Sequence, residues 1–331
     1  MKRARILSVG KYLPERRVTN FDLEKMFETS DEWIQQRTGI VERRYADEGV
    51  YCSDLALEAS RDCLKNAGMK PEDLDFIIFA TLSPDHFFPG NGVYLQRKLG
   101  VTDIGCMDIR NQCSGFLYSL AVADAFIRIG MYKRILVVGA EIHSGALNYT
   151  FEGRDVAVLF GDAAGAVLVG PSDDPSRGIL SSHLHADGRF ADILKLELLD
   201  ISKKPYITHK SLDEGQQYPK MKGKEVFKVA VEKIPLVIRE ALAANNLKVE
   251  DVDLFLPHQA NLRINQFAAE RLGVSHDKFY NNIQRYGNTT AASIPLLLDE
   301  VLEKGIMKEG QLVVMVAFGS GFTWGASVMR W

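Results

Sequence analysis

The sequence has few cysteines and no long apolar run near its start, and these shortages exclude several classes of protein. Among its 331 residues there are only four cysteines, Cys52, Cys63, Cys106 and Cys113. No two of them form the CxxC pair of a zinc or redox site, and in a chain with no secretory signal we expect thiols rather than bridges. The apolar run Ile6 to Val9 is far too short for a signal peptide or a membrane span. We therefore expect a cytoplasmic protein without a membrane span.

Charge and ligand spacing argue against three further classes. A net charge of −3 gives no basic excess of the kind that nucleic-acid binding requires. His183 and His185 fall on one strand face, but no third ligand at metal spacing accompanies them, so no metal site is expected. No glycine-rich turn has the GxGxxG spacing of a dinucleotide site, and we expect no nicotinamide or flavin. With 46% hydrophobic residues, the chain is expected to bury a substantial core.

Strand-like apolar runs alternate with helix-length amphipathic segments along nearly the whole chain. The runs predicted to be strands are Asp75–Ala80, Arg134–Gly139, Ala157–Val169, Asp253–Leu256 and Leu312–Ala317. Such alternation predicts layers of helix and sheet, and no proline-rich or glycine-rich linker divides the chain. One long polar run without a clear period, residues 200–222, is predicted to be an inserted loop or hairpin.

The two halves of the chain repeat each other weakly. The paired segments are residues 68–81 with 246–259, residues 160–170 with 318–329, and residues 113–130 with 288–305. These pairs predict a duplicated α/β unit, with one half in residues 1–172 and the other in residues 173–331. The third pair places Cys113 and Asn288 at equivalent positions. In a pseudo-twofold structure equivalent helix starts converge near the axis, so we expect one site shared between the halves.

Cys113 is a candidate nucleophile because of its place before a predicted helix. It precedes the apolar segment Phe116 to Ile129, which has the composition of a buried helix. A cysteine at a helix N-terminus feels the positive end of the helix dipole and unpaired N–H groups, and both favour the thiolate. Cysteine is also a common core residue, so packing alone is an equally ordinary explanation of the local sequence.

Two further polar residues stand at predicted element ends. His258 follows an apolar strand and precedes a helix, which is where α/β proteins place ligands and catalysts, although a satisfied structural histidine also fits. Asn288 precedes a helix, and asparagine is a favoured N-cap in any case. Glycine-bearing turns at residues 161–165, 287 and 319–325 let the backbone aim N–H groups at a ligand, as an oxyanion hole requires, but tight turns in a packed core need glycine too.

Taken together, these residues resemble the β-ketoacyl-acyl-carrier-protein synthase III family. The resemblance spans the whole chain and is carried by long, specific segments. They are SDEWIQQRTGIVERR (residues 30–44), NQCSGF (111–116), FGDAAGA (160–166), GKEVFKVAV (223–231), PHQANLRI (257–264), YGNTTAASIP (286–295) and FGSGFTWGA (318–326). The resemblance implies an α/β, thiolase-like fold, duplicated in five αβαβα layers, and a homodimer.

The resemblance also implies roles for individual residues. Cys113, His258 and Asn288 would be the catalytic triad, and the backbone N–H groups of Cys113 and Ser320 would form the oxyanion hole. Trp33 and Arg154 would sandwich the adenine of coenzyme A. Further residues would line the pantetheine tunnel, the partner's acyl pocket and the carrier-protein surface: Thr29, Arg37, Gly223, Phe227, Asn261 and Arg263 for the tunnel, Phe88 for the pocket across the dimer, and Lys228, Arg263 and Arg271 for the carrier protein.

The implied reaction is an acyl transfer from acyl-CoA to Cys113, followed by decarboxylative condensation with malonyl-acyl-carrier protein, with no cofactor. Thiolases instead place a second cysteine in the C-terminal glycine turn, and here that turn, residues 319–325, has none. The alternatives are a relative that condenses or transfers longer or unusual acyl chains in specialised metabolism, and a non-catalytic partner subunit. The longer segment 200–222 and the doubled aromatic Phe87-Phe88 leave the chain length and branching of the acyl group open.

Overall fold

The computed structural model describes residues 2–331 and contains two main β-sheets with related strand order. The strands of the first sheet are, in spatial order, β1 (Ala4–Tyr12), β7 (Ala163–Pro171), β6 (Ile135–Glu141), β4 (Phe76–Ala80) and β5 (Gly105–Ile109). Those of the second sheet are β11 (Leu254–Pro257), β12 (Leu312–Gly319), β13 (Thr323–Arg330) and β8 (Gly178–Ala186). Central strands such as β4, β6 and β12 are buried along their whole length, as expected for strands covered on both faces.

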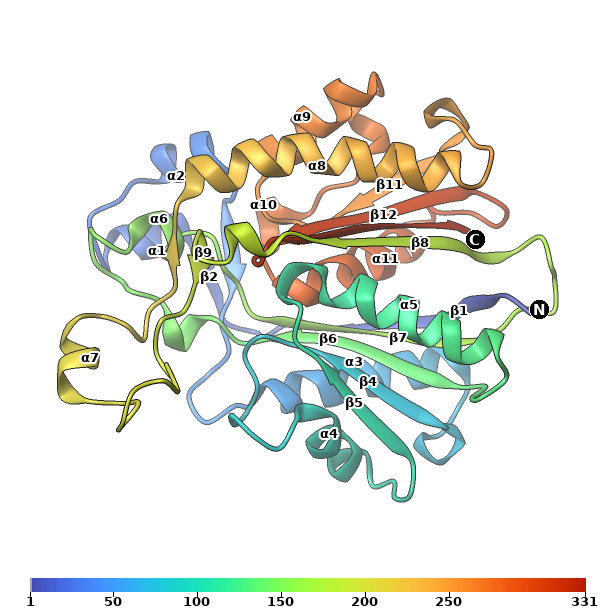
Figure 1. Cartoon of the computed structure of the whole chain (residues 1–331), viewed down its shortest axis with the longest axis horizontal. Helices are drawn as coiled ribbons and strands as arrows, with labels where there is room; N and C mark the ends of the chain where they lie inside the picture. Colours follow the sequence, from blue (N-terminus) through green and yellow to red (C-terminus); the bar gives the residue numbers. More distant parts are fainter. Residues whose placement is uncertain (1) are drawn as a thin grey trace.

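Helices cover both sheets and fill the space between them, as Figure 1 shows. Helices α5 (Gly115–Arg128) and α11 (Ser293–Glu303) lie between the sheets. Helices α3 (Cys52–Ala67) and α4 (Asn91–Leu99) cover the outer face of the first sheet, and α8 (Gly223–Ala243) and α9 (Leu262–Leu272) cover that of the second. The predicted thiolase-like, duplicated αβαβα arrangement in five layers is confirmed.

The duplication is visible in the pairing of the strands. In the first sheet β4 pairs parallel with β6, and β6, β7 and β1 then pair antiparallel. In the second sheet β11 pairs parallel with β12, and β12, β13 and β8 then pair antiparallel. The counterpart of β5 is reduced to one parallel bridge between Phe255 and Phe279.

The predicted equivalence of Cys113 and Asn288 is wrong at the helix starts. Helices α5 and α11 each follow a short 3₁₀ turn whose first residue has a positive φ, 43° at Gln112 and 48° at Thr290. Cys113 therefore corresponds to Ala291, and Asn288 lies earlier in its half. Helix α5 has 14 residues and α11 has 11, so aligning the two sequences at their C-terminal glycines shifts the register at their starts.

The predicted strand Ala157–Val169 is also too long. Residues Arg154–Ala157 form the short helix α6, and β7 begins only at Ala163. Between them the chain turns at Gly161, where a side chain would meet the carbonyl oxygen of Tyr286 at 2.3 Å. Apolar composition did not reveal this turn because the residues on both sides of it are buried.

The polar segment 200–222 forms a loop closed by a small hairpin, as predicted. Strands β9 (Leu194–Lys195) and β10 (Lys220–Met221) pair antiparallel, and the loop between them carries the short helix α7 (His209–Asp213). Figure 1 shows this loop projecting from the layered body.

The remaining short elements lie beside the layers on the same side as this loop. They are β2 (Arg17–Thr19), β3 (Glu42–Arg44), α1 (Asn20–Glu24), α2 (Asp31–Thr38) and α10 (Ile283–Tyr286). Across residues 2–331, no helix combines the length and the apolar character needed to cross a membrane.

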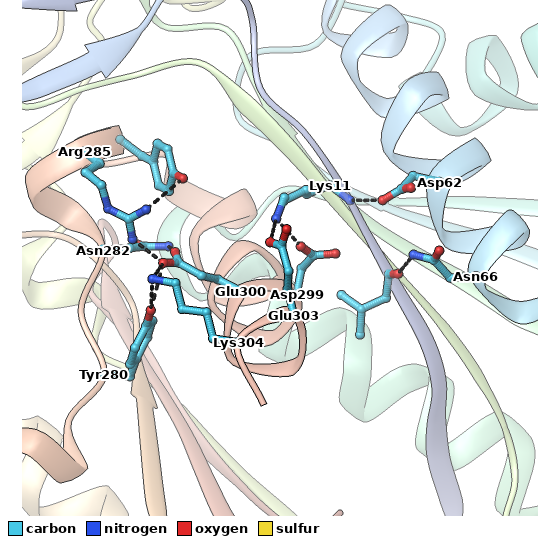
Figure 2. A network of polar contacts seen from close by, with 12 residues as sticks. Lys11, Asp62, Asn66, Tyr280, Asn282, Arg285, Asp299, Glu300, Glu303 and Lys304 are labelled. Atoms are coloured by element: carbon cyan, nitrogen blue, oxygen red, sulfur yellow. Dashed lines mark hydrogen bonds and ion pairs between the residues drawn. The ribbon is translucent and has the colours of Figure 1, made fainter. Parts of the chain in front are cut away.

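Glu300 links α11 to residues 280–285, the segment that precedes Asn288. Its carboxylate accepts hydrogen bonds from Tyr280 Oη at 2.8 Å and Asn282 Nδ2 at 3.0 Å. It also pairs with Arg285 and with Lys304, as Figure 2 shows. The side chain is only 5% exposed, and these donors hold its pKa near 2, well below its ordinary value, despite burial. The interaction thus joins residues 280–285 to the central layer.

We expect Glu300→Gln to lower the free energy of unfolding at pH 7 by about 2 kcal/mol, because a buried charged acceptor of four donors is lost. The folded-state pKa lies below the ordinary value of 4.5, so this contribution is complete above about pH 4.5 and is lost as the pH falls toward 2. Urea unfolding at pH 7 and at about pH 3, within the range where the contribution is lost, measures both effects.

Glu303→Gln is the matched control for this variant. Glu303 lies on the same helix and pairs with Lys11, but it is 68% exposed, so its loss should cost less than about 1 kcal/mol. Equal destabilisation by the two variants would contradict the special role of Glu300.

Candidate active site

Cys113, His258 and Asn288 line one cavity with a volume of about 620 Å³. The cavity wall comes from both halves of the chain, because Cys113 precedes α5, whereas His258 follows β11 and Asn288 precedes α11. Six of the residues that the resemblance assigns to coenzyme A also line it: Trp33, Arg37, Gly223, Phe227, Asn261 and Arg263. The structure thus brings the predicted triad and most of the predicted tunnel together.

Two backbone N–H groups point at the sulfur of Cys113. The N–H of Cys113 itself and that of Ser320 lie near enough to Sγ to lower the pKa of the thiol. The hydroxyl of Ser320 is held by the carbonyl oxygen of Leu194 at 2.5 Å, which fixes the turn after β12. Gly319 lets that turn lie close to Cys113, because a side chain at position 319 would lie 2.7 Å from the Cβ of Cys113. These are the two donors expected for the oxyanion hole.

The charge state of Cys113 differs from the sequence expectation. Burial raises the pKa of the Cys113 thiol to about 12, with a smaller contribution from the nearby carboxyl of Glu141 and an opposing one from the two N–H groups. The side chain is 8% exposed, so the thiolate would lose most of its hydration. The resting residue is therefore a thiol. The N–H groups of Cys113 and Ser320 can stabilise the negative charge that develops during the reaction.

Glu141 is a buried acid near the site that sequence reasoning missed. It ends β6 and accepts hydrogen bonds from the N–H groups of Leu82 and Ser83 and from the hydroxyls of Ser83 at 2.6 Å and Thr81 at 3.1 Å, and the nearby N–H of Ala291 also lowers its pKa. Burial raises its pKa to about 7. The carboxyl joins the loop after β4 to the turn that begins α11. An acid at the end of the apolar run ILVVGAE was the available signal.

His258 is held on one side of its ring and free on the other. Its Nδ1 lies 2.6 Å from the Oγ of Ser293, whereas its buried Nε2 has no hydrogen-bond partner among residues 2–331. Burial lowers the pKa of His258 to about 3, so the imidazole is neutral near pH 7. A neutral ring with one unengaged nitrogen can exchange hydrogen bonds with a substrate but carries no charge.

Asn288 is oriented by its own turn rather than used as a helix cap. Its Oδ1 accepts the N–H of Thr290 at 2.9 Å, and its backbone N–H donates to the carbonyl oxygen of Leu159 at 2.8 Å. The N-cap position of α11 belongs to Ala292, which makes no side-chain cap. Because Oδ1 accepts the N–H of Thr290, the Nδ2 group of Asn288 is the polar group that can donate to a substrate in the cavity.

Trp33 and Arg37 line the cavity, and Arg154, which is outside the cavity wall, lies against the ring of Trp33. The guanidinium groups of Arg37 and Arg154 lie 4.6 and 4.7 Å from the ring centroid of Trp33, within cation–π range. Arg154 also lies 4.2 Å from the ring centroid of Phe151. An adenine between Trp33 and Arg154 needs a ring-to-guanidinium separation of roughly 7 Å, so the expected sandwich requires Arg154 to move.

The other predicted tunnel residues have partly structural contacts. Asn261 is the N-cap of α9: its Oδ1 accepts the N–H of Arg263 at 2.9 Å, and its Nδ2 donates to the carbonyl oxygen of Arg37 at 2.9 Å. Arg263 lies 5.7 Å from the ring centroid of Phe227. Thr29 is outside the cavity wall, and its buried Oγ1 has no partner among the described residues 2–331.

Five more predicted site residues also lie outside the cavity wall: Arg154, which contacts Trp33; Ser320, whose backbone lies near Cys113; and Phe88, Lys228 and Arg271. Phe88 is 79% exposed in the single chain. Lys228 is exposed on α8, and the guanidinium of Arg271 lies 5.2 Å from the ring centroid of Phe267 on α9. His183 and His185 both hydrogen-bond to Glu240, at 2.9 and 2.8 Å.

Part of the cavity wall is apolar and was not singled out from the sequence. It includes Val158, Leu159, Phe160, Ala230 and Ile234. Their apolar composition is the same as that of core residues, so no local signal separates them from the core. Together they give the site a surface suited to an aliphatic chain.

Sequence comparison identifies relatives along the whole chain. The family description "3-oxoacyl-(acyl-carrier-protein) synthase III" matches residues 107–188, and its "C terminal" counterpart matches residues 242–331. A relative named β-ketoacyl-(acyl-carrier-protein) synthase III, from Caldanaerobacter subterraneus subsp. tengcongensis, is 47% identical over 328 residues, which cover 99% of this chain and 98% of that protein.

Solved structures of proteins with the same name are similar to this chain along nearly its whole length. The 3-oxoacyl-(acyl-carrier-protein) synthase III of Aquifex aeolicus VF5 superposes with a TM-score of 0.90 at 43% identity, covering 99% of this chain and 100% of that one. The synthase III of Thermus thermophilus gives a TM-score of 0.91 at 41% identity, covering 99% of both chains. The chain therefore belongs to the β-ketoacyl-acyl-carrier-protein synthase III family of thiolase-fold condensing enzymes.

Proposed function

We propose that this chain starts fatty-acid synthesis by a decarboxylative Claisen condensation, as a β-ketoacyl-acyl-carrier-protein synthase III. In this reaction an acyl-CoA acylates Cys113, and a malonyl group on acyl-carrier protein extends it to a β-ketoacyl product. The observation that carries the proposal is a thiol with two N–H groups aimed at it, on one cavity with a neutral histidine and an asparagine.

The first half-reaction is acyl transfer to Cys113. Its sulfur attacks the thioester carbonyl, and the N–H groups of Cys113 and Ser320 stabilise the oxyanion of the tetrahedral intermediate. The intermediate then breaks its bond to the sulfur of coenzyme A, which leaves with the proton that the thiol gave up. Transfer thus uses backbone donors and requires no metal or redox cofactor.

The second half-reaction is condensation with the malonyl thioester. As carbon dioxide leaves, the electron pair of the broken bond enters an enolate, whose oxygen accepts hydrogen bonds from Nε2 of His258 and Nδ2 of Asn288. The carbanion attacks the acyl group on Cys113, and the released thiolate regains a proton from solvent. Neutral donors suit this step because a strong acid would protonate the enolate, and burial keeps the pKa of His258 near 3.

We propose that coenzyme A enters at the end of the cavity lined by Trp33 and Arg37, where Arg154 lies against Trp33. Arg154 swings away from Trp33 so that adenine stacks between them, while the pantetheine arm follows Gly223, Phe227, Asn261 and Arg263 toward Cys113. In support, four of these tunnel residues and Trp33 line one continuous cavity with the thiol.

We propose a homodimer in which Phe88 closes the partner's acyl pocket. In support, Phe87 and Phe88 are 60% and 79% exposed in the single chain, a large apolar surface for two adjacent residues.

We also propose that the chain divides into halves of residues 1–172 and 173–331, because β7 ends at Pro171 and β8 begins at Gly178. A cytoplasmic location fits this substrate set.

The alternative we retain is a family member that condenses or transfers longer or unusual acyl chains in specialised metabolism. The loop that carries α7 and the pair Phe87-Phe88 are the observations that favour it, since both regions flank the acyl pocket in the family. Incubation with a panel of acyl-CoAs, followed by measurement of the mass added to Cys113, separates the two possibilities. A non-catalytic role is disfavoured because all three triad residues are present.

The two half-reactions should respond differently to substitution. We expect Cys113→Ala to abolish acyl-enzyme formation, and His258→Ala and Asn288→Ala to lose decarboxylation and condensation by roughly a hundredfold or more with much smaller losses in acyl transfer. The reason is that the donors for transfer are backbone groups. Intact-protein mass spectrometry measures the first half-reaction, and release of labelled carbon dioxide measures the second.

Two results would contradict these assignments. If Cys113→Ala still gains one acyl group per chain, the nucleophile is another residue. If His258→Ala and Asn288→Ala impair both half-reactions equally, the division of labour between backbone and side-chain donors is wrong.

The carrier protein is acidic, and this chain has a net charge of −3, so docking requires a local basic surface. We propose a surface formed by Lys228 on α8 and by Arg263 and Arg271 on α9. Arg263 lines the cavity, and Phe227 and Phe267, 6.2 Å apart, connect α8 to α9 beneath these cations. Exposed Glu225 and Glu270 weaken the field of the surface.

Arg271→Glu tests this surface, since Arg271 lies outside the cavity. We expect association with malonyl-acyl-carrier protein to slow several-fold at low salt and to depend less on salt, while acylation by acyl-CoA changes little. Stopped-flow kinetics across a salt series gives both values. Lys308→Glu, an exposed residue before β12, makes the same charge change as a control, and equal slowing by both variants would refute the surface.

A further inference from the structure

Ser293 is a buried residue that the mechanism above does not use, and it lies against the ring of His258. It is the first residue of α11 and is 2% exposed. Its Oγ lies 2.6 Å from Nδ1 of His258, the ring nitrogen remote from the substrate. The condensation step depends on the opposite nitrogen, Nε2, being a donor. Which nitrogen carries the proton of the neutral ring is therefore decided at Ser293.

The hydroxyl hydrogen of Ser293 has two acceptors within reach, Nδ1 of His258 and the carbonyl oxygen of Thr290 at 3.0 Å. The Thr290 carbonyl already accepts the backbone N–H of Ser293, so it stays paired without the hydroxyl. The 2.6 Å contact joins Oγ to Nδ1 whichever group donates, so it is the separate pairing of the Thr290 carbonyl that favours donation from the hydroxyl to Nδ1.

The surroundings of Ser293 Oγ agree with this direction. The backbone N–H of Gln259 approaches the same oxygen at 3.4 Å, so the hydroxyl accepts from Gln259 while it donates to the ring. No other hydrogen bond to Nδ1 is present among residues 2–331. Without the hydroxyl, Nδ1 would be a buried acceptor without a donor, which disfavours the tautomer that leaves it unprotonated.

We propose that Ser293 is a positioning residue that donates its hydroxyl hydrogen to Nδ1 and thereby holds neutral His258 with its proton on Nε2. The catalytic consequence rests on the proposed function, because condensation needs Nε2 as a donor to the enolate oxygen. The same turn orients the second donor, since the N–H of Thr290 occupies Oδ1 of Asn288 and leaves Nδ2 for the substrate. Ser293 thus acts through His258 and does not touch the reacting atoms.

The tautomer can be measured directly by ¹⁵N NMR of the full-length protein labelled at histidine, with the His258 signals assigned by their loss in His258→Gln. The expected wild-type pattern is a protonated Nε2 and an unprotonated Nδ1. In Ser293→Ala the pattern should shift toward a protonated Nδ1, and Ser293→Thr, which keeps the hydroxyl, should restore the wild-type pattern. A wild-type ring protonated on Nδ1 would overturn the proposal, whatever the variants do.

Activity gives the second readout. Ser293→Ala should lower malonyl decarboxylation by roughly tenfold or more and acylation of Cys113 much less, as expected for the support of a catalytic group. Ser60→Ala removes another buried hydroxyl, one that donates to the carbonyl oxygen of Ala56 far from the cavity, and should affect neither step. Equal losses in both half-reactions with an unchanged tautomer would show a merely structural role and overturn the proposal.

A failure of the proposed function would give different results from a failure of the assignment at Ser293. If the wild-type protein condensed no malonyl thioester, the function would be wrong, while the ¹⁵N pattern would still decide the assignment at Ser293. If Ser293→Ala does not fold, the wild-type spectrum and Ser293→Thr decide it.

Discussion

The site depends on the close approach of backbones where α5 and α11 begin, between the two sheets. A side chain at Gly139 of β6 would lie 2.2 Å from the carbonyl oxygen of Ala291, and one at Gly319 would lie 2.7 Å from the Cβ of Cys113. Only glycine permits these contacts. Because packing brings the turn after β12 against Cys113, the N–H of Ser320 reaches the sulfur without any side chain to position it, and the oxyanion hole is a product of the fold.

The second helix start is held more tightly than the first. Thr290 is a β-branched residue with a positive φ of 48°, a conformation that persists only where the surroundings impose it. Its hydroxyl lies 2.7 Å from Nε2 of buried His143, its N–H donates to Oδ1 of Asn288, and the next N–H, that of Ala291, lowers the pKa of nearby Glu141. Burial lowers the pKa of His143 to about 3, so this support is neutral near pH 7. The turn can therefore hold Asn288, and support His258 through Ser293, without becoming mobile.

Much of this arrangement was predictable from the sequence, and the failures have physical causes. Apolar runs and internal repeats predicted the layers, residue types at element ends made Cys113, His258 and Asn288 candidates, and the family resemblance assigned them their roles. The equivalence of Cys113 and Asn288 failed because repeats align helix ends but do not reveal a change in helix length. Ser293 and Glu141 were missed because a serine at a helix start and an acid at a strand end have common structural explanations, and only contacts with distant residues reveal their place.

The same burial that disfavours a resting thiolate makes the site effective during reaction. Cys113, His258 and Glu141 all have pKa values displaced toward their neutral forms, because each is removed from water. In such surroundings fixed N–H dipoles interact strongly with a negative charge, and they need no reorganisation when it appears. Charge develops first on the oxyanion at Cys113 and then on the enolate at His258 and Asn288. A site whose thiol and imidazole are neutral at rest, but which aims donors at both positions, stabilises the transition states of the two steps more than the bound substrates.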